Sequence, residues 1–157
     1  MAAALPVPGY DGSVGGDAAA NGRNVAQIEI DMKTQGEIEA AICEGISRFE
    51  QTYLGRGPKD IRAHLIGDLL LVRLQGVLTA AEQQLVKVLS GEKGRDLLKQ
   101  VRTHLIETAR PTMEALVQEA TGVKVLSLHH DISTATGEEI VVFTLAGAPL
   151  FREIKKV

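Results

Sequence analysis

Residues 60–77 carry the pattern that most narrows the folds open to this chain. Two segments rich in apolar residues, 60–66 and 69–77, flank Gly67-Asp68, a dipeptide suited to reversing a chain in two residues. Pairing outward from that turn predicts an antiparallel hairpin with three opposed apolar pairs on one face. These pairs are Ile61 with Leu74, Ala63 with Val72, and Leu65 with Leu70.

The opposite face of this hairpin brings basic side chains together. The register places Arg62 directly opposite Arg73, and His64 lies one step along, opposite Leu71. Like charges in opposed positions destabilise a sheet, so the pattern indicates a nearby carboxylate, a solvated rim or a bound anion. Guanidinium groups suit carboxylate, phosphate or bicarbonate, and Arg56 in the preceding connector can add a third. Screening of two exposed arginines by acidic residues is the commoner arrangement and stays open.

Two capping boxes mark helix starts. Thr34 with Glu37, and Thr79 with Glu82, each place a hydroxyl and a carboxylate three residues apart ahead of an apolar run of helical spacing. Gly55 predicts the end of the first of these helices, because glycine readily adopts the left-handed conformation that stops a helix.

A longer helix is predicted over residues 94–120. Pro111 lies inside it, so we expect a kink or a break near Arg110. Arg95, Arg102 and Arg110 are spaced widely among glutamates, which is typical of a solvated or partner-facing surface. The apolar stripe expected to face the core consists of Leu98, Val101, Leu105, Ala109, Leu116 and Ala120.

A second hairpin is predicted from residues 123–134 and 138–146 around Thr136-Gly137. The element order is then α-β-β-α-α-β-β, in which a helix and a hairpin occur twice. This order predicts an α+β fold with a four-stranded antiparallel sheet and helices packed on one face. We expect residues 27–157 to form a single domain and residues 1–26, rich in Ala, Gly and Pro, to form a disordered tail.

No motif identifies catalytic, cofactor-binding or metal-binding chemistry. His129, His130 and Asp131 are adjacent, but neighbours in a strand point to opposite faces and cannot chelate one ion together. Cys43 is expected to be a half-buried structural thiol. We therefore predict a non-enzyme without metal or cofactor. A small-anion or nucleotide-binding enzyme and an RNA-binding module are the alternatives, and the shortage of stacking aromatics disfavours RNA.

Composition restricts the partners and the compartment. The 157 residues have a formal net charge of −3, which argues against nucleic acid as a partner. One cysteine and the lack of a long apolar run predict a cytoplasmic protein. The open edges of a four-stranded sheet need cover, which predicts a homodimer.

Several stretches resemble a bacterial protein family. They are YLGRGP at 53–58, LVRLQGVLT at 71–79, RP at 110–111, TGVKV at 121–125 and HDIST at 130–134. The likeness covers residues 34–146 and is to the MpsC family, formerly known only as a domain of unknown function.

The resemblance implies a small soluble component of a sodium-translocating, membrane-potential-generating system. Its membrane partners resemble respiratory antiporter subunits and are linked to inorganic carbon uptake. This implies a non-catalytic accessory or regulatory protein, peripheral to the inner face of the membrane, and no catalytic residues are carried over. On physical grounds, the residues expected to bind an anion or a partner are Arg56, Arg62, His64, Arg73 and Arg110.

Overall fold

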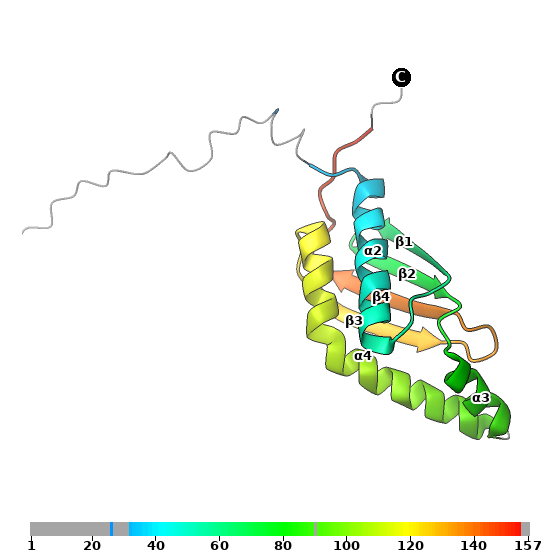
Figure 1. Cartoon of the computed structure of the whole chain (residues 1–157). Coiled ribbons are helices and arrows are strands. Elements are labelled where there is room, and N and C mark those ends of the chain that lie inside the picture. Colours follow the sequence, from blue (N-terminus) through cyan, green and yellow to red (C-terminus); the bar gives the residue numbers. More distant parts are fainter. Residues whose placement is uncertain (1–25, 27–31, 90, 155–157) are drawn as a thin grey trace, which may run out of the picture.

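The computed structural model describes residue 26, residues 32–89 and residues 91–154 (Figure 1). The tail predicted for residues 1–26 therefore lies, apart from Ala26, outside the described residues. The elements are α2 (Gln35–Leu54), β1 (Asp60–Ile66), β2 (Leu69–Gln75), α3 (Ala80–Val88), α4 (Glu92–Thr121), β3 (Val125–Ile132) and β4 (Glu139–Leu145). The predicted order α-β-β-α-α-β-β is confirmed.

The four strands form one antiparallel sheet in the order β1-β2-β4-β3. Each hairpin supplies one inner and one outer strand, and the two hairpins join where β2 pairs with β4. The predicted register of the first hairpin is confirmed, including Leu65 opposite Leu70 and Arg62 opposite Arg73. Figure 1 shows α2 and α4 lying across one face of the sheet. Within the described part of the chain, no helix covers the other face.

Both predicted capping boxes are present. At the start of α2, the Glu37 amide donates to Thr34 Oγ1 (3.2 Å) and the Thr34 amide donates to the Glu37 carboxylate (2.8 Å). Thr79 and Glu82 make the same reciprocal pair at the start of α3. Gly55 ends α2 in the left-handed conformation, with φ of 82°. These caps satisfy amides that the first turn of a helix leaves without partners.

Helix α4 runs unbroken from Glu92 to Thr121, through Pro111. The predicted break therefore does not occur. Figure 1 shows α4 changing direction where its colour passes from green to yellow, in agreement with the predicted kink. Proline lacks the amide hydrogen and crowds the carbonyl four residues earlier, which bends a helix without necessarily ending it.

The core lies between the sheet and the two long helices. Buried residues of α4 recur at intervals of four and three, and they differ from the predicted stripe at several positions: Gly94, Leu98, Arg102, Ile106, Ala109, Met113, Val117 and Thr121. Val101, predicted to face the core, is 45% exposed. The observed stripe is rotated about the helix relative to the predicted one, with Arg102 facing the core and Val101 facing solvent.

Candidate functional site

The uncovered face of the sheet has an apolar centre and a charged rim. Leu71 on β2 is the register partner of Val142 on β4, and Ile140 follows on β4 with its side chain on the same face. All three are partly exposed. The rim of this face consists of Arg62, His64, Arg73, His129 and Asp131. An apolar centre with a polar rim is the usual make-up of a surface that binds another protein.

The two opposed arginines on this face each have a carboxylate partner. Arg73 Nε donates to Glu138 Oε2 at 2.8 Å, and Arg62 Nε lies 3.5 Å from Asp60 Oδ2. All four side chains are between 32% and 70% exposed, so each pair contributes at most about 1 kcal/mol. The acidic partners offset the repulsion that the register imposes. Anion binding by this face stays a prediction, and an anion at Arg73 has to compete with Glu138.

The predicted site residues do not all share one surface. Arg62, His64 and Arg73 lie together on the uncovered sheet face. Arg110 lies on α4, where its Nε donates to Glu114 at 2.7 Å. Arg56 lies in the connector after α2, where its Nη1 donates to the Leu78 carbonyl at 3.0 Å.

A cluster of ionisable side chains lies buried between the sheet and the helices. Arg102 is 2% exposed and donates to both oxygens of Glu82, at 2.8 and 2.7 Å. It also donates to Glu139 at 3.0 Å and to the Val77 carbonyl at 3.1 Å. Glu50 is 1% exposed, with Oε2 3.9 Å from Arg102 Nη1. One guanidinium group thus connects α4 with α3, α2 and the start of β4.

The surroundings of this cluster raise the pKa of one of its carboxyl groups and lower the pKa of the other two. Burial, followed by the nearby Glu139 carboxylate, raises the pKa of Glu50 to about 9 despite the opposing effect of Arg102. Burial also disfavours the charge of Glu139, but contacts with His130, Glu50 and Arg102 outweigh it and lower the pKa of Glu139. The pKa of Glu82 is lowered because hydrogen bonds from Arg102 outweigh its burial. At neutral pH, Arg102 therefore faces two carboxylates and one neutral carboxyl group.

Arg102 is buried, so the prediction that it lies with Arg95 and Arg110 on a solvated or partner-facing surface is wrong for Arg102. Its position carried a usable signal, because it lies four residues after buried Leu98 and four before buried Ile106. Glu50 carries the same signal, since it continues the four-residue series of buried isoleucines at 38, 42 and 46. A charged residue at a core position of a helix indicates a buried ion pair.

His130 lies on the core face with its side chain 6% exposed. Its Nε2 is 3.6 Å from Glu139 Oε1 and has no hydrogen-bond partner within the described residues. His129 and Asp131 lie on the opposite face, where Asp131 accepts from Lys99 at 2.9 Å. Among the described residues, no group of three or more His, Cys, Asp or Glu is placed to hold a metal ion.

Cys43 is partly buried on α2, as predicted. Its Sγ lies 3.8 Å from the Ile61 carbonyl, to which the thiol donates a weak hydrogen bond. Burial raises the pKa of this thiol. A raised pKa lowers the thiolate fraction, so the surroundings favour an unreactive structural cysteine.

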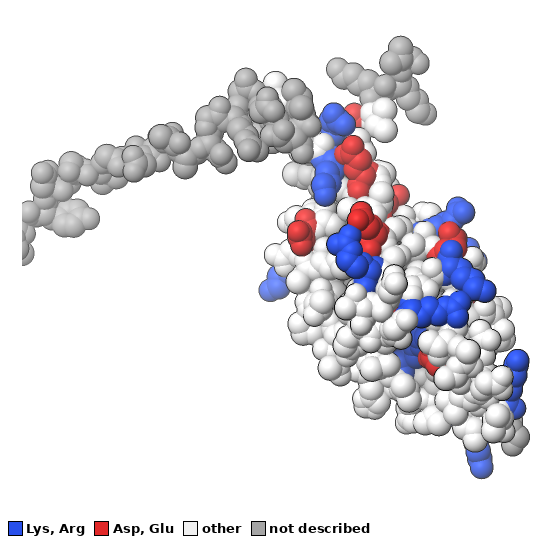
Figure 2. Space-filling view, in the orientation of Figure 1, with Lys and Arg blue, Asp and Glu red and all other residues white. Residues whose placement is uncertain are grey.

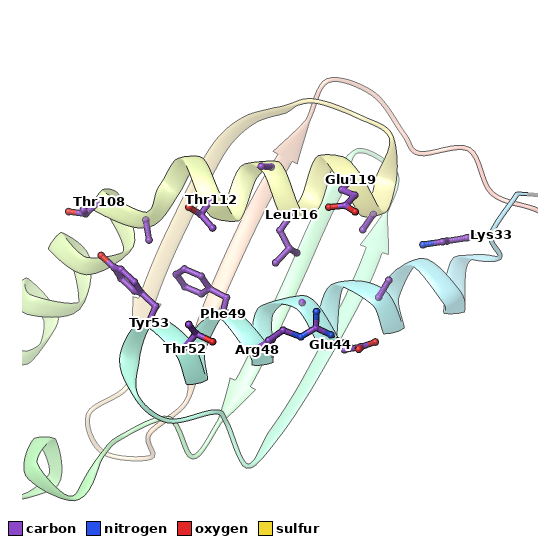
Figure 3. A pocket seen from close by; sticks show the side chains of 15 residues that line it. Lys33, Glu44, Arg48, Phe49, Thr52, Tyr53, Thr108, Thr112, Leu116 and Glu119 are labelled. Atoms are coloured by element: carbon purple, nitrogen blue, oxygen red, sulfur yellow. Dashed lines mark hydrogen bonds and ion pairs between the residues drawn. The ribbon is translucent and has the colours of Figure 1, made fainter. Parts of the chain in front are cut away.

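A groove of about 760 Å³ runs along the outer side of the helix layer, between α2 and α4 (Figure 3). Phe49 and Tyr53 of α2 stack with ring centroids 5.2 Å apart. Figure 3 shows both rings directed toward α4, near Thr108 and Thr112. In Figure 2, few charged side chains lie over the middle of α4 and the C-terminal end of α2. The charged residues that line the groove are two cations and two carboxylates: Lys33, Arg48, Glu44 and Glu119.

The fold and its surfaces define an α+β protein with a half-covered sheet. No helix in the described part of the chain is both long and apolar enough to cross a membrane. A family model described as Na+-translocating membrane potential-generating system (MpsC) matches residues 34–147. The chain belongs to the MpsC family.

One curated relative is 34% identical over 125 residues, a match that covers 80% of this chain and 98% of the relative. It is the protein from Bacillus subtilis (strain 168) described as uncharacterized protein YbcI. No solved structure matches this chain.

Proposed function

We propose that this protein is a non-catalytic accessory component of a Na+-translocating, membrane-potential-generating system. The observation that carries the proposal is the match of the family model to residues 34–147. In this proposal the protein is cytoplasmic, works peripheral to the inner face of the membrane and regulates a cation-translocating or inorganic-carbon uptake complex. Its partners are the membrane subunits of that complex.

The docking surface in this proposal is the uncovered face of the sheet. Leu71, Ile140 and Val142 form its partly exposed apolar centre, and the charged rim around them has its own carboxylate partners. Burying the apolar centre against a partner is favourable by roughly 25 cal/mol per Å² of apolar surface. The charged rim then determines how the partner is oriented on this face. It adds little to the affinity, because its ion pairs are solvated. A membrane subunit that presents an apolar segment flanked by polar residues suits this face.

Co-purification with the membrane subunits from detergent-solubilised membranes tests this proposal. The wild-type chain is expected to retain them, and Val142→Asp is expected to lose them because a carboxylate enters the apolar centre. Val101→Asp on α4 is the matched control, since it makes the same change at a side chain 45% exposed on the other side of the molecule. Failure of the folded wild-type chain to retain any membrane subunit contradicts the proposal.

Anion binding by the arginine-bearing sheet face is a second part of the proposal. Bicarbonate is expected to raise the melting temperature of the wild-type protein, because a ligand that binds the folded state stabilises it. Arg73→Ala is expected to abolish that rise. Arg48→Ala, which removes another solvated arginine with a carboxylate partner, is the control. An unchanged rise in Arg73→Ala contradicts anion binding at this face.

A further inference from the structure

A second, smaller hollow lies where the connector between α2 and β1, the end of β2, α3 and the loop between β3 and β4 meet. It has a volume of about 320 Å³, near the lower end for small-molecule sites. Three cationic side chains line it: Arg56, Lys59 and Lys87. Thr134 and Thr136 line the same hollow with hydroxyl-bearing side chains. We call this hollow the basic cleft.

The basic cleft differs from the other hollows in its charge. Among the residues that the structure describes, no Asp or Glu lines it, although the chain has 20 acidic and 17 basic residues. A neighbouring hollow is lined by two cations and two carboxylates: Arg95, Lys99, Asp131 and Glu138. The groove between α2 and α4 is balanced in the same way. Three cations without a carboxylate repel one another, so this arrangement favours an anion from outside the chain.

The contacts within the basic cleft hold its cations in place while leaving donors available. Arg56 uses Nη1 to hold the Leu78 carbonyl at 3.0 Å, and its other donors have no partner among the described residues. The stem of Lys59 lies across Gly76, where an added Cβ would come within 2.7 Å of Lys59 Cδ. Gly76 has φ of 66°, in the left-handed region that favours glycine. Glycine at this position lets the lysine stem cross the backbone at the edge of the cleft.

We propose that the basic cleft binds a phosphate group. A phosphate carries up to two negative charges and several oxygens, enough to accept from Arg56, Lys59 and Lys87 together. A carboxylate or bicarbonate has fewer acceptor oxygens and a single charge. The hydroxyls of Thr134 and Thr136 supply neutral donors at the same site. The group comes from a small soluble phosphate ester or from an anionic lipid headgroup, and the size of the cleft suits either.

The basic cleft includes neither the apolar centre nor the rim of the uncovered sheet face, so this proposal stands apart from docking and from anion binding at Arg73. The full chain is titrated with inorganic phosphate, against chloride at equal ionic strength, and followed by amide NMR. Saturable shifts are expected at Gly76, Thr134, Thr136 and Gly137, which line the cleft. A second arm measures sedimentation with phosphatidylglycerol vesicles and with phosphatidylcholine vesicles.

The deciding variant is Lys59→Gln/Lys87→Gln, which keeps the side-chain stems and removes two charges from exposed positions. Affinity is expected to fall about tenfold or more, since each lost charge-assisted hydrogen bond weakens binding. Arg95→Gln/Lys99→Gln is the matched control, because it removes two charges from the neighbouring hollow. Its affinity is expected to stay within about twofold of the wild type. Melting curves confirm that both variants fold.

Each outcome decides the proposal. Phosphate binding without vesicle binding assigns the cleft to a soluble phosphate ester. Sedimentation with phosphatidylglycerol alone, lost in Lys59→Gln/Lys87→Gln, assigns it to a lipid headgroup. Equal weakening by the control variant, or no saturable binding in either arm, overturns the proposal. The cations then serve only as the basic end of α3 and a charged edge of β1.

Discussion

Arg102 on α4 donates to the carboxylate of Glu139 at the start of β4, across 3.0 Å, with both side chains removed from water. A charge so placed stabilises the fold only while its partners remain, because desolvation of an unpaired ion costs more than the pair gains. The same guanidinium group holds Glu82 of α3 through two hydrogen bonds. The packing of three elements therefore depends on one side chain.

Replacing Arg102 with leucine is expected to destabilise the protein strongly. Arg102→Leu takes the guanidinium partner from the buried carboxylate of Glu139 and from the partly buried carboxylate of Glu82, which costs about 3–5 kcal/mol. Urea denaturation measures the loss. Arg95→Leu on the same helix is the control, and because its side chain is 46% exposed we expect a change within about 0.5 kcal/mol. Similar losses in the two variants would show that Arg102 does not organise the cluster.

The raised pKa of Glu50 predicts that stability falls as pH rises. The folded protein keeps this proton until about pH 9, whereas the unfolded chain releases it near the ordinary value of 4.5. The unfolding free energy is therefore expected to decrease from about pH 5 to about pH 9, by at most about 1.4 kcal/mol per pH unit for one proton. Glu50→Gln keeps a neutral group at this position, so we expect it to flatten the decrease.

Urea denaturation at several pH values measures this effect, with the exposed Glu44→Gln as the control. The lowered pKa values of Glu139 and Glu82 act in the opposite direction. Their contribution is present above about pH 4.5 and is lost as pH falls, in the wild type and in Glu50→Gln alike. If Glu50→Gln keeps the full alkaline decrease, Glu50 is not the group responsible.

Two glycines in helices are expected to respond to alanine with opposite signs. At Gly94 of α4, an added Cβ would lie 3.0 Å from the Leu85 carbonyl oxygen and 3.2 Å from Val86 Cα, where α3 passes close by. Gly94→Ala is therefore expected to destabilise by about 1–3 kcal/mol through overpacking. Gly36 on α2 has nothing within 4 Å, so Gly36→Ala is expected to stabilise by about 0.5–1 kcal/mol. Thermal melting compares them, and a stable Gly94→Ala contradicts close α3–α4 packing.

The outer strands β1 and β3 leave hydrogen-bonding edges on the sheet, and we predict that two copies of the chain associate through such an edge. Light scattering is expected to give a mass twice the 16.8 kDa of the chain. A monomer mass at high protein concentration contradicts this prediction.

The local signals in the sequence predicted the architecture well, because each acts over a few residues. The turn at Gly67-Asp68 set the register of β1 and β2, and the hydroxyls of Thr34 and Thr79 set two helix starts. The buried cluster was missed because its members come from separate segments. Glu50 and Arg102 meet only after α2 and α4 pack on the sheet, and a charge at a core position was assigned to the surface by its chemistry alone.

In the candidate surfaces, too, the sequence predicted the contacts set by local register and missed the contacts between distant segments. The hairpin register brought Arg62, His64 and Arg73 together on one face, as the sequence predicted. The carboxylate that pairs with Arg73 comes from Glu138, far along the chain, and the partners of Arg56 in the basic cleft come from three other segments. Spacing along the sequence carries no information about such contacts.

Site-specific photocrosslinking in intact cells tests most directly whether the uncovered sheet face binds the membrane partner. A photoreactive residue replaces His64, which is exposed on that face, and in a second protein it replaces Arg48, which is exposed on α2. We expect a crosslink from position 64 to a membrane subunit of the Na+-translocating system and none from position 48. Crosslinking from position 48 alone, or from neither position, would contradict it.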